Sequence, residues 1–160
     1  MRSIASLAFL LACAVASSSC GPKVDLTKGL QVSIVSTGWF DAGIVDGKNK
    51  LVPTVSVRLK NVSDQTLPML QVNALFRRLT DRDEWGSGFL TAAGPSGLAP
   101  GAETEVTIKS NLGYTGTESR QEMLRNSQFV DAKVTLFAKY GSGQLTRLGD
   151  YPITRQLLTQ

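Results

Sequence analysis

Apolar and polar residues alternate one by one along much of this chain. The longest alternation places an apolar residue at every second position from Val130 to Ala138. Shorter alternations occupy residues 30–34, 55–60, 70–76, 105–109 and 151–153, and residues 85–90 form a weaker one because they include two glycines. A period of two places successive side chains on opposite faces of a strand, one toward a core and one toward water. The pattern therefore predicts about seven strands.

Turn-forming residues separate these segments. They are Asp46-Gly47, Asn61-Val62-Ser63-Asp64, Gly94-Pro95-Ser96-Gly97, Pro100-Gly101 and Gly141-Ser142-Gly143. Short strands separated by turns of this kind are typical of two-sheet sandwiches. We therefore expect an all-β fold, a seven-stranded antiparallel immunoglobulin-like sandwich. The antibody type is excluded, because no pair of cysteines flanks a central tryptophan.

One segment interrupts the strand pattern. Residues 117–126 read as a short helix that Thr117 would cap, with Glu118 near its start and Arg125 near its end. This helix would precede the penultimate strand, at a place where sandwich chains often cross from one sheet to the other.

The N-terminus follows a different pattern. Arg2 precedes an uncharged apolar run over residues 4–16, and Ser17-Ser18-Ser19-Cys20-Gly21 follows it. A run of about 13 residues suits a signal peptide and falls short of the roughly 20 that span a bilayer. We expect residues 1–19 to be removed, residues 20–29 to form a tether, and residues 30–160 to form the sandwich domain.

The residues around Cys20 resemble the lipobox of bacterial lipoproteins, although Ser17 stands where a leucine is commonest. The resemblance implies a lipid on Cys20 that anchors an exported protein to the membrane. Gly21 in place of an aspartate favours the outer membrane, facing the periplasm. Leu10-Leu11-Ala12-Cys13 is an alternative acceptor site with Cys13 as the lipidated residue. A plain secretory signal, cut near Ser19 and leaving Cys20 as a free thiol, is the other alternative.

A second resemblance covers about 24 residues. Two neighbouring segments resemble the first hairpin of bacterial envelope domains of the FxLYD type. They are Val57-Arg58-Leu59-Lys60-Asn61 through Leu67, and Val72-Asn73-Ala74-Leu75-Phe76-Arg77. Arg77-Arg78 replaces the tyrosine–aspartate end of that motif. The layout is also similar to that of the small lipoproteins of the YcfL type, and neither resemblance implies an enzymatic activity.

Composition narrows the chemistry. The chain has no histidine, which removes His-assisted nucleophilic catalysis and His-ligated metals. Of its two cysteines, only Cys20 would remain after signal cleavage, so no intramolecular disulfide is expected.

The net charge of +4 comes from scattered basic residues, which argues against nucleic-acid binding. We expect no catalytic residues, no cofactor and no metal. The acidic segment Asp81-Arg82-Asp83-Glu84 lacks the ligand spacing of a calcium loop.

Aromatic residues are the best candidates for recognition. The candidate partner-binding residues are Trp39, Phe40, Trp85, Leu112 and Tyr114. Exposed aromatic side chains rimmed by polar residues are typical of interfaces. The alternative is that each of them caps one end of the sandwich core. The loop at residues 111–116 is the first place where we expect a partner.

These observations predict a non-enzymatic, membrane-anchored envelope lipoprotein that binds or assembles another envelope protein. Three alternatives remain open. The first is a structural subunit of an envelope or secretion machine, like the transthyretin-like lipoprotein of type VI secretion. The second is a periplasmic carrier of a small ligand in an apolar pocket. The third is an enzyme that uses only carboxylates and lysines. The oligomeric state stays open, because an edge strand can pair between copies.

Overall fold

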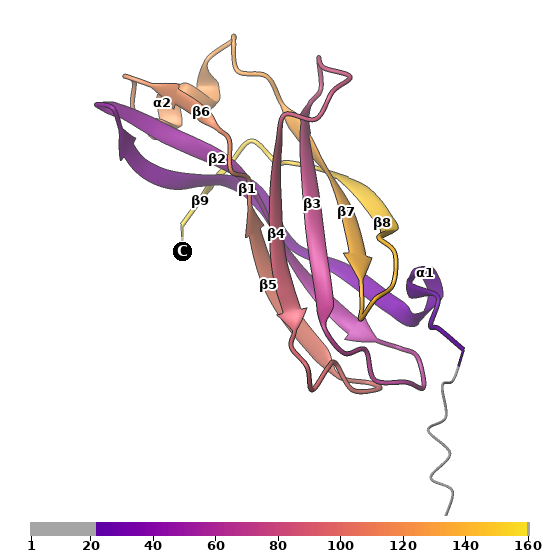
Figure 1. The fold of residues 1–160 in the computed structure, drawn as a ribbon. Coiled ribbons are helices and arrows are strands. Elements are labelled where there is room, and N and C mark those ends of the chain that lie inside the picture. The colour runs from indigo at the N-terminus through magenta and orange to yellow at the C-terminus, as the bar shows by residue number, and fades with distance from the viewer. Residues whose placement is uncertain (1–21, 160) are drawn as a thin grey trace, which may run out of the picture.

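Two β-sheets pack face to face to form the domain (Figure 1). The computed structural model describes residues 22–159, so the predicted signal peptide and Cys20 lie outside the described residues. One sheet has the order β5–β2–β1–β9, and β6 also pairs with β2. Its strands are β1 (Leu30–Val45), β2 (Lys48–Asn61), β5 (Glu103–Lys109), β6 (Tyr114–Gly116) and β9 (Leu157–Leu158). The other sheet has the order β4–β3–β7–β8, with β3 (Leu70–Arg78), β4 (Gly86–Ala93), β7 (Ala132–Lys139) and β8 (Thr146–Pro152).

The all-β prediction is confirmed, and each of the seven predicted segments forms a strand. The count of seven is wrong, because β6 and β9 bring the described residues to nine strands. The purely antiparallel arrangement is also wrong, because β9 runs parallel to β1, with Trp39 opposite Leu157. Strands of 3 and 2 residues are too short to show an alternation, which is why the sequence pattern missed both.

A bulge in β1 decides which aromatic residue enters the core. The register between β1 and β2 shifts between Ile34 and Ser36. Such a shift moves every later side chain of the strand to the other face. Trp39 therefore lies wholly buried between the sheets, whereas Phe40 lies on the outer side. The strand then continues to a tight turn at Asp46-Gly47, where both residues have positive φ, as a two-residue hairpin requires.

The segment Val55 to Arg78 is not a hairpin. Its two strands, β2 and β3, belong to different sheets, so the loop between them crosses the sandwich. The predicted capped turn is confirmed, because the buried Asn61 side chain accepts from Ser63 N and donates to the carbonyls of Gln65 and Leu98. Leu67 returns the chain to the core, where it is fully buried.

Two short helices complete the fold. Helix α2 (Arg120–Arg125) lies within the predicted range, but its N-cap is Ser119 rather than Thr117. Ser119 and Glu122 bond each other's backbone N–H in a capping box, which fixes the helix start. As predicted, α2 lies where the chain crosses between the two sheets, from β6 to β7. Its expected place before the penultimate strand is wrong, because the short β9 follows β8 and makes β7 the third strand from the end of the described residues.

Helix α1 (Leu26–Gly29) falls in the segment expected to be a tether. Asp25 caps it, and Leu26 is buried in the core. The packed part of the chain therefore begins before Leu30, because the hydrophobic gain of burying Leu26 holds this turn against the sandwich. Within residues 22–159, neither helix has the length and apolar character to cross a membrane.

Candidate functional site

Four aromatic side chains pack together at the end of the sandwich that carries α2 and β6. We call Trp39, Trp85, Tyr114 and Phe129 the aromatic cluster. The Trp39 ring lies 4.6 Å from that of Phe129 and 5.5 Å from that of Tyr114, centroid to centroid. The Tyr114 ring in turn lies 4.9 Å from Trp85 and 4.8 Å from Phe129. Such separations are typical of favourable aromatic pairs. The cluster therefore closes this end of the core.

Burial divides the cluster into an inner and an outer half. Trp39 is fully buried and Phe129 is 8% exposed, while Trp85 and Tyr114 are half-buried. The indole N–H of Trp39 has no hydrogen-bond partner among the described residues. An unpartnered buried donor costs about 1–3 kcal/mol. The Trp39 ring thus has a structural role, whereas the half-buried rings of Trp85 and Tyr114 are open to contact with another molecule.

Two arginines flank the cluster. The Arg78 guanidinium lies 5.6 Å from the Trp85 ring centroid, and that of Arg155 lies 5.0 Å from the Phe129 centroid. Arg78 also bonds Asp81, which holds the pKa of that carboxyl below its usual value. Arg155 bonds Asp131 and donates to the Phe129 carbonyl. Arg155 therefore ties the C-terminal segment to the loop that supplies Phe129.

Tyr114 connects the cluster to the neighbouring loop. Its hydroxyl donates to the Val130 carbonyl at 3.2 Å. Burial raises the pKa of this phenol, and the nearby Arg78 charge opposes that effect. Tyr114 therefore stays neutral at physiological pH and acts here as a donor and an apolar surface, not as an acid–base group.

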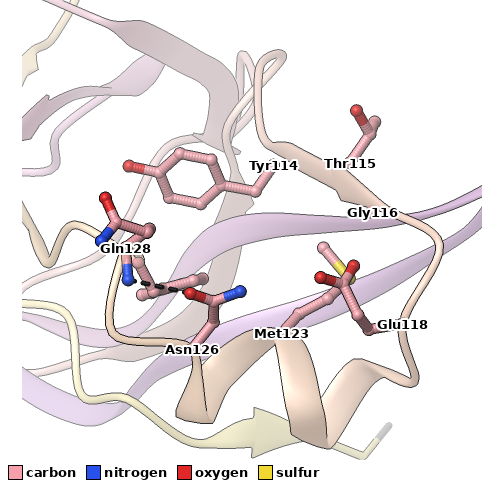
Figure 2. Close-up of a pocket in the computed structure, with 8 residues that line it drawn as sticks. Tyr114, Thr115, Gly116, Glu118, Met123, Asn126 and Gln128 are labelled. Atoms are coloured by element: carbon pink, nitrogen blue, oxygen red, sulfur yellow. Dashed lines mark hydrogen bonds between the residues drawn. The ribbon is translucent and has the colours of Figure 1, made fainter.

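A hollow of about 180 Å³ opens beside the outer part of the cluster (Figure 2). Met123 and the rings of Tyr114 and Phe129 supply its apolar part. Its polar part comes from the side chains of Thr115, Glu118, Asn126 and Gln128, and Gly116 completes the lining. The Asn126 side chain accepts from Gln128 N at 2.9 Å, which orders the loop on one side of the hollow.

The size of this hollow limits what it can hold. Sites for drug-sized ligands commonly span about 300–1,000 Å³. A space of about 180 Å³ accommodates one side chain or a small fragment instead. Its lining combines an apolar floor with polar groups at the edge, the arrangement that anchors a single residue of a protein partner.

The local sequence explains how the walls of the hollow are held. Gly113 passes so close to the Leu51 carbonyl that a Cβ there would clash with it, so only glycine allows β6 to start at Tyr114. Asn49 of β2 donates to the Glu118 carbonyl at 2.7 Å. Asp41 of β1 pairs with Arg120 of α2, which lowers the pKa of the Asp41 carboxyl. These contacts fix α2 against the long β1–β2 hairpin.

The structure separates the predicted partner-binding residues into four groups. Trp85 and Tyr114 lie together in the outer half of the cluster. Trp39 is wholly buried, so it cannot contact a partner directly, and its prediction as a surface residue is wrong. Phe40 is outside the cluster, and the Lys109 ammonium covers its ring at 3.2 Å. Leu112 is exposed in the loop before β6 but does not line the hollow.

Sequence reasoning missed Phe129 and Met123. Phe129 directly precedes the alternating segment of β7. An aromatic residue at the start of a strand could have indicated that its ring packs against the core. Met123 is an apolar residue in the predicted helix, three residues before Asn126. Neither residue indicates a hollow by itself, because the hollow forms only where β6, α2 and the following loop meet.

The described residues hold no group of three or more acidic or cysteine side chains placed to bind a metal ion. Asp81, in the acidic segment considered as a calcium loop, instead pairs with Arg78.

Comparisons with known proteins add little. No protein-family model matches the chain, and no curated protein matches it. Among solved structures, it is similar to Northeast Structural Genomics Consortium target SoR45, with 11% identity, a TM-score of 0.47, and coverage of 81% of this chain and 89% of that one. It is also similar to AT1g01470 of Arabidopsis thaliana, with 14% identity, a TM-score of 0.44, and coverage of 81% and 83%. Likenesses of this size identify neither a family nor a function.

Proposed function

We propose that this chain is an exported, lipid-anchored envelope protein without enzymatic activity, and that its sandwich domain binds a protein partner. The observation that carries the binding role is the hollow beside Tyr114 and Phe129, which has an apolar floor and a polar edge. The absence of histidine from the sequence supports a non-enzymatic role. We also propose that the sandwich is of the immunoglobulin-like type, with the parallel β1–β9 pair as a departure from it.

The arrangement of the two ends supports this proposal. The N-terminal helix α1 lies at one end of the molecule, and α2 with β6 lies at the other (Figure 1). Cys20 lies two residues before Pro22, where the described chain begins near α1. A lipid at Cys20 would attach the chain at the α1 end, away from the hollow. That separation leaves the hollow accessible to a protein partner.

At this site, the size of the hollow favours a side chain of a protein partner over a small-molecule ligand. A carrier encloses most of its ligand, and the space beside Tyr114 is smaller than typical small-molecule sites. The role of structural subunit remains compatible with the same surface, because a neighbouring subunit would be the partner. Native mass spectrometry of the purified protein tests the carrier: a bound small molecule that is retained after exchange would favour it.

The binding role is tested by blocking the hollow without disturbing the aromatic cluster. Gln128→Arg places a long charged side chain at the edge of the hollow, at an exposed position. Gln144→Arg is the matched control, because Gln144 is exposed in the loop between β7 and β8, away from the hollow. We expect Gln128→Arg to reduce partner recovery about tenfold or more, with unchanged circular dichroism, and Gln144→Arg to have no effect. Equal recovery with both variants would contradict the proposed surface.

The anchor is tested separately. Metabolic labelling with a radiolabelled fatty acid should mark the native chain and not the Cys20→Ala variant. Loss of label at Cys13→Ala instead would move the anchor seven residues upstream, the difference between positions 20 and 13. No label in the native chain would make it a secreted or periplasmic domain and would refute the lipid anchor.

A further inference from the structure

The outer face of the four-stranded sheet carries apolar residues where a solvated face is expected to be polar. The strand pairings place Phe89, Asn73, Phe137 and Arg147 in one row across β4, β3, β7 and β8. Leu75 lies in the next row, between Ser87 and Thr135. Phe89 is 61% exposed, and Leu79, beyond the end of β3, is 60% exposed. We call this surface the β3–β7 face; in Figure 1 no helix covers it.

Basic residues surround the apolar part of the β3–β7 face. Arg77 and Lys133 are direct cross-strand neighbours, and Lys139 lies opposite Gln71. Like charges placed directly opposite each other destabilise a sheet. Among the ion pairs of the described residues, none involves Arg77, Lys133 or Lys139. The one basic residue of this face with an acidic partner is Arg147, which pairs with Asp150.

The outer face of the other sheet has a different composition. There Arg58 pairs with Glu105 at 3.0 Å, and Lys60 pairs with Glu103 at 3.4 Å. Ser56 and Thr107 bond each other between these same strands. These parts of β2 and β5 are polar with balanced charges, as solvation requires. Exposed apolar residues of that sheet, such as Ile34, Val35 and Ile44, lie on β1, whereas on the β3–β7 face the exposed Phe89 lies among basic residues that have no acidic partner.

We propose that the β3–β7 face lies on an anionic phospholipid bilayer. Basic side chains near such a surface each contribute about 1 kcal/mol through the negative surface potential. Exposed aromatic and aliphatic residues between them add apolar contact at the boundary of the headgroups. A depression lined by Leu79, Lys133, Asp150, Tyr151 and Pro152 lies at one edge of this face. The rest is an open sheet surface, which suits a flat bilayer better than it suits a protruding ligand.

The attachment point of the chain lies beside this face. Val24 N donates to the Tyr140 hydroxyl, and Tyr140 follows directly after Lys139 of β7. Lys23 and Lys28 add two basic residues at the same end. This step rests on the proposed lipid at Cys20, which would hold Lys139 close to the headgroups; the charge and apolar character of the face do not depend on it.

The test measures the reactivity of individual lysines in the native full chain. The purified protein is reconstituted into vesicles of phosphatidylcholine, with or without about one third phosphatidylglycerol. A water-soluble amine reagent then labels exposed lysines, and mass spectrometry gives the rate at each position. Lys133 and Lys139 report the β3–β7 face, and Lys60 on the opposite face is the internal control.

We expect labelling of Lys133 and Lys139 to slow at least fivefold in vesicles with phosphatidylglycerol, while Lys60 is unchanged. About 0.5 M sodium chloride should restore the rates, because salt screens the attraction. Phe89→Ser should lower the protection severalfold, whereas Ile44→Ser, at a 70% exposed position on the β1–β2 hairpin, should not.

Three outcomes would overturn the proposal. One is equal labelling of both faces in anionic vesicles. Another is protection that is the same in pure phosphatidylcholine, which would remove the role of charge. The third is protection in detergent without lipid that rises with protein concentration, which would assign the face to a second copy of the chain. None of these outcomes bears on partner recovery through Gln128, so failure here leaves the proposed binding role standing.

Discussion

The two ends of the sandwich are closed in different ways. At the α1 end, polar groups close the structure: Asn61 is fully buried and all its polar atoms are bonded to the loops beside it. At the α2 end, aromatic rings close it, with an unpartnered indole N–H on Trp39 and a hollow beside Tyr114. The α1 end thus has a hydrogen-bonded polar network, whereas the α2 end has packed aromatic rings with one unbonded buried N–H and an open hollow beside them.

This difference indicates a division of roles. A fully bonded buried network fixes one geometry, because losing any member leaves others unsatisfied. Aromatic rings can pack against one another while part of each ring stays exposed to solvent. Part of the Trp85 and Tyr114 side chains is exposed in this way. We therefore propose that the α1 end serves stability and chain attachment, and that the α2 end combines stability with a contact surface.

The largest expected effect is at Asn61. Asn61→Ala should lower the free energy of unfolding by about 2–4 kcal/mol, because the carbonyls of Gln65 and Leu98 each lose one donor and the Ser63 amide loses its acceptor. Asn111→Ala is the matched control near the α2 end, where the exposed Asn111 side chain accepts only from Ser87 N. Its cost should stay below about 1 kcal/mol. Urea unfolding of both variants measures the difference, and equal costs would remove the contrast between the ends.

The next effect concerns the wall of the hollow. Met123→Ala should cost about 2 kcal/mol, near the low end for a buried methionine, because it widens an existing hollow instead of creating a sealed cavity. Met69→Ala is the control, since Met69 is exposed. Thermal unfolding measures both. A Met123→Ala variant as stable as the native chain would show that α2 does not pack as described.

The sequence predicted the strands much better than the site. Period-two alternation located every long strand, because one face of each is buried in the core. It did not reveal the bulge after Ile34 that turns Trp39 inward and Phe40 outward, since a bulge leaves no mark in the apolar pattern. The hollow beside Tyr114 depends on contacts between β6, α2 and the loop at Phe129, which no local pattern encodes.

A smaller effect is expected at the Tyr114 hydroxyl. Tyr114→Phe should cost about 1 kcal/mol through the lost bond to the Val130 carbonyl. Burial raises the pKa of Tyr114 in the folded state, so its contribution is fully present below about pH 10 and is lost as the pH rises through the folded-state pKa. Stability measured from pH 8 to 11 should therefore fall less steeply in the variant. Parallel curves would argue against burial of this phenol.

The smallest effect concerns the ion pair that ties α2 to β1. Arg120 lowers the pKa of Asp41, so the contribution of Asp41 is present above the unfolded-state pKa of about 4 and is lost as the pH falls through the folded-state value. Amide exchange in α2 should accelerate slightly between pH 5 and 3, relative to the intrinsic rate. Asp41→Asn should remove that pH dependence. Retention of the same dependence in the variant would assign it to another carboxyl group.

The most direct test of the central claim compares cross-linking at the two ends in living cells. A photoreactive amino acid replaces Gln128 at the edge of the hollow or Gln144 in the exposed loop near α1. We expect a discrete cross-linked species with one protein at position 128 and none of that species at position 144. The same product at both positions, or at position 144 alone, would contradict the assignment of partner binding to the aromatic end.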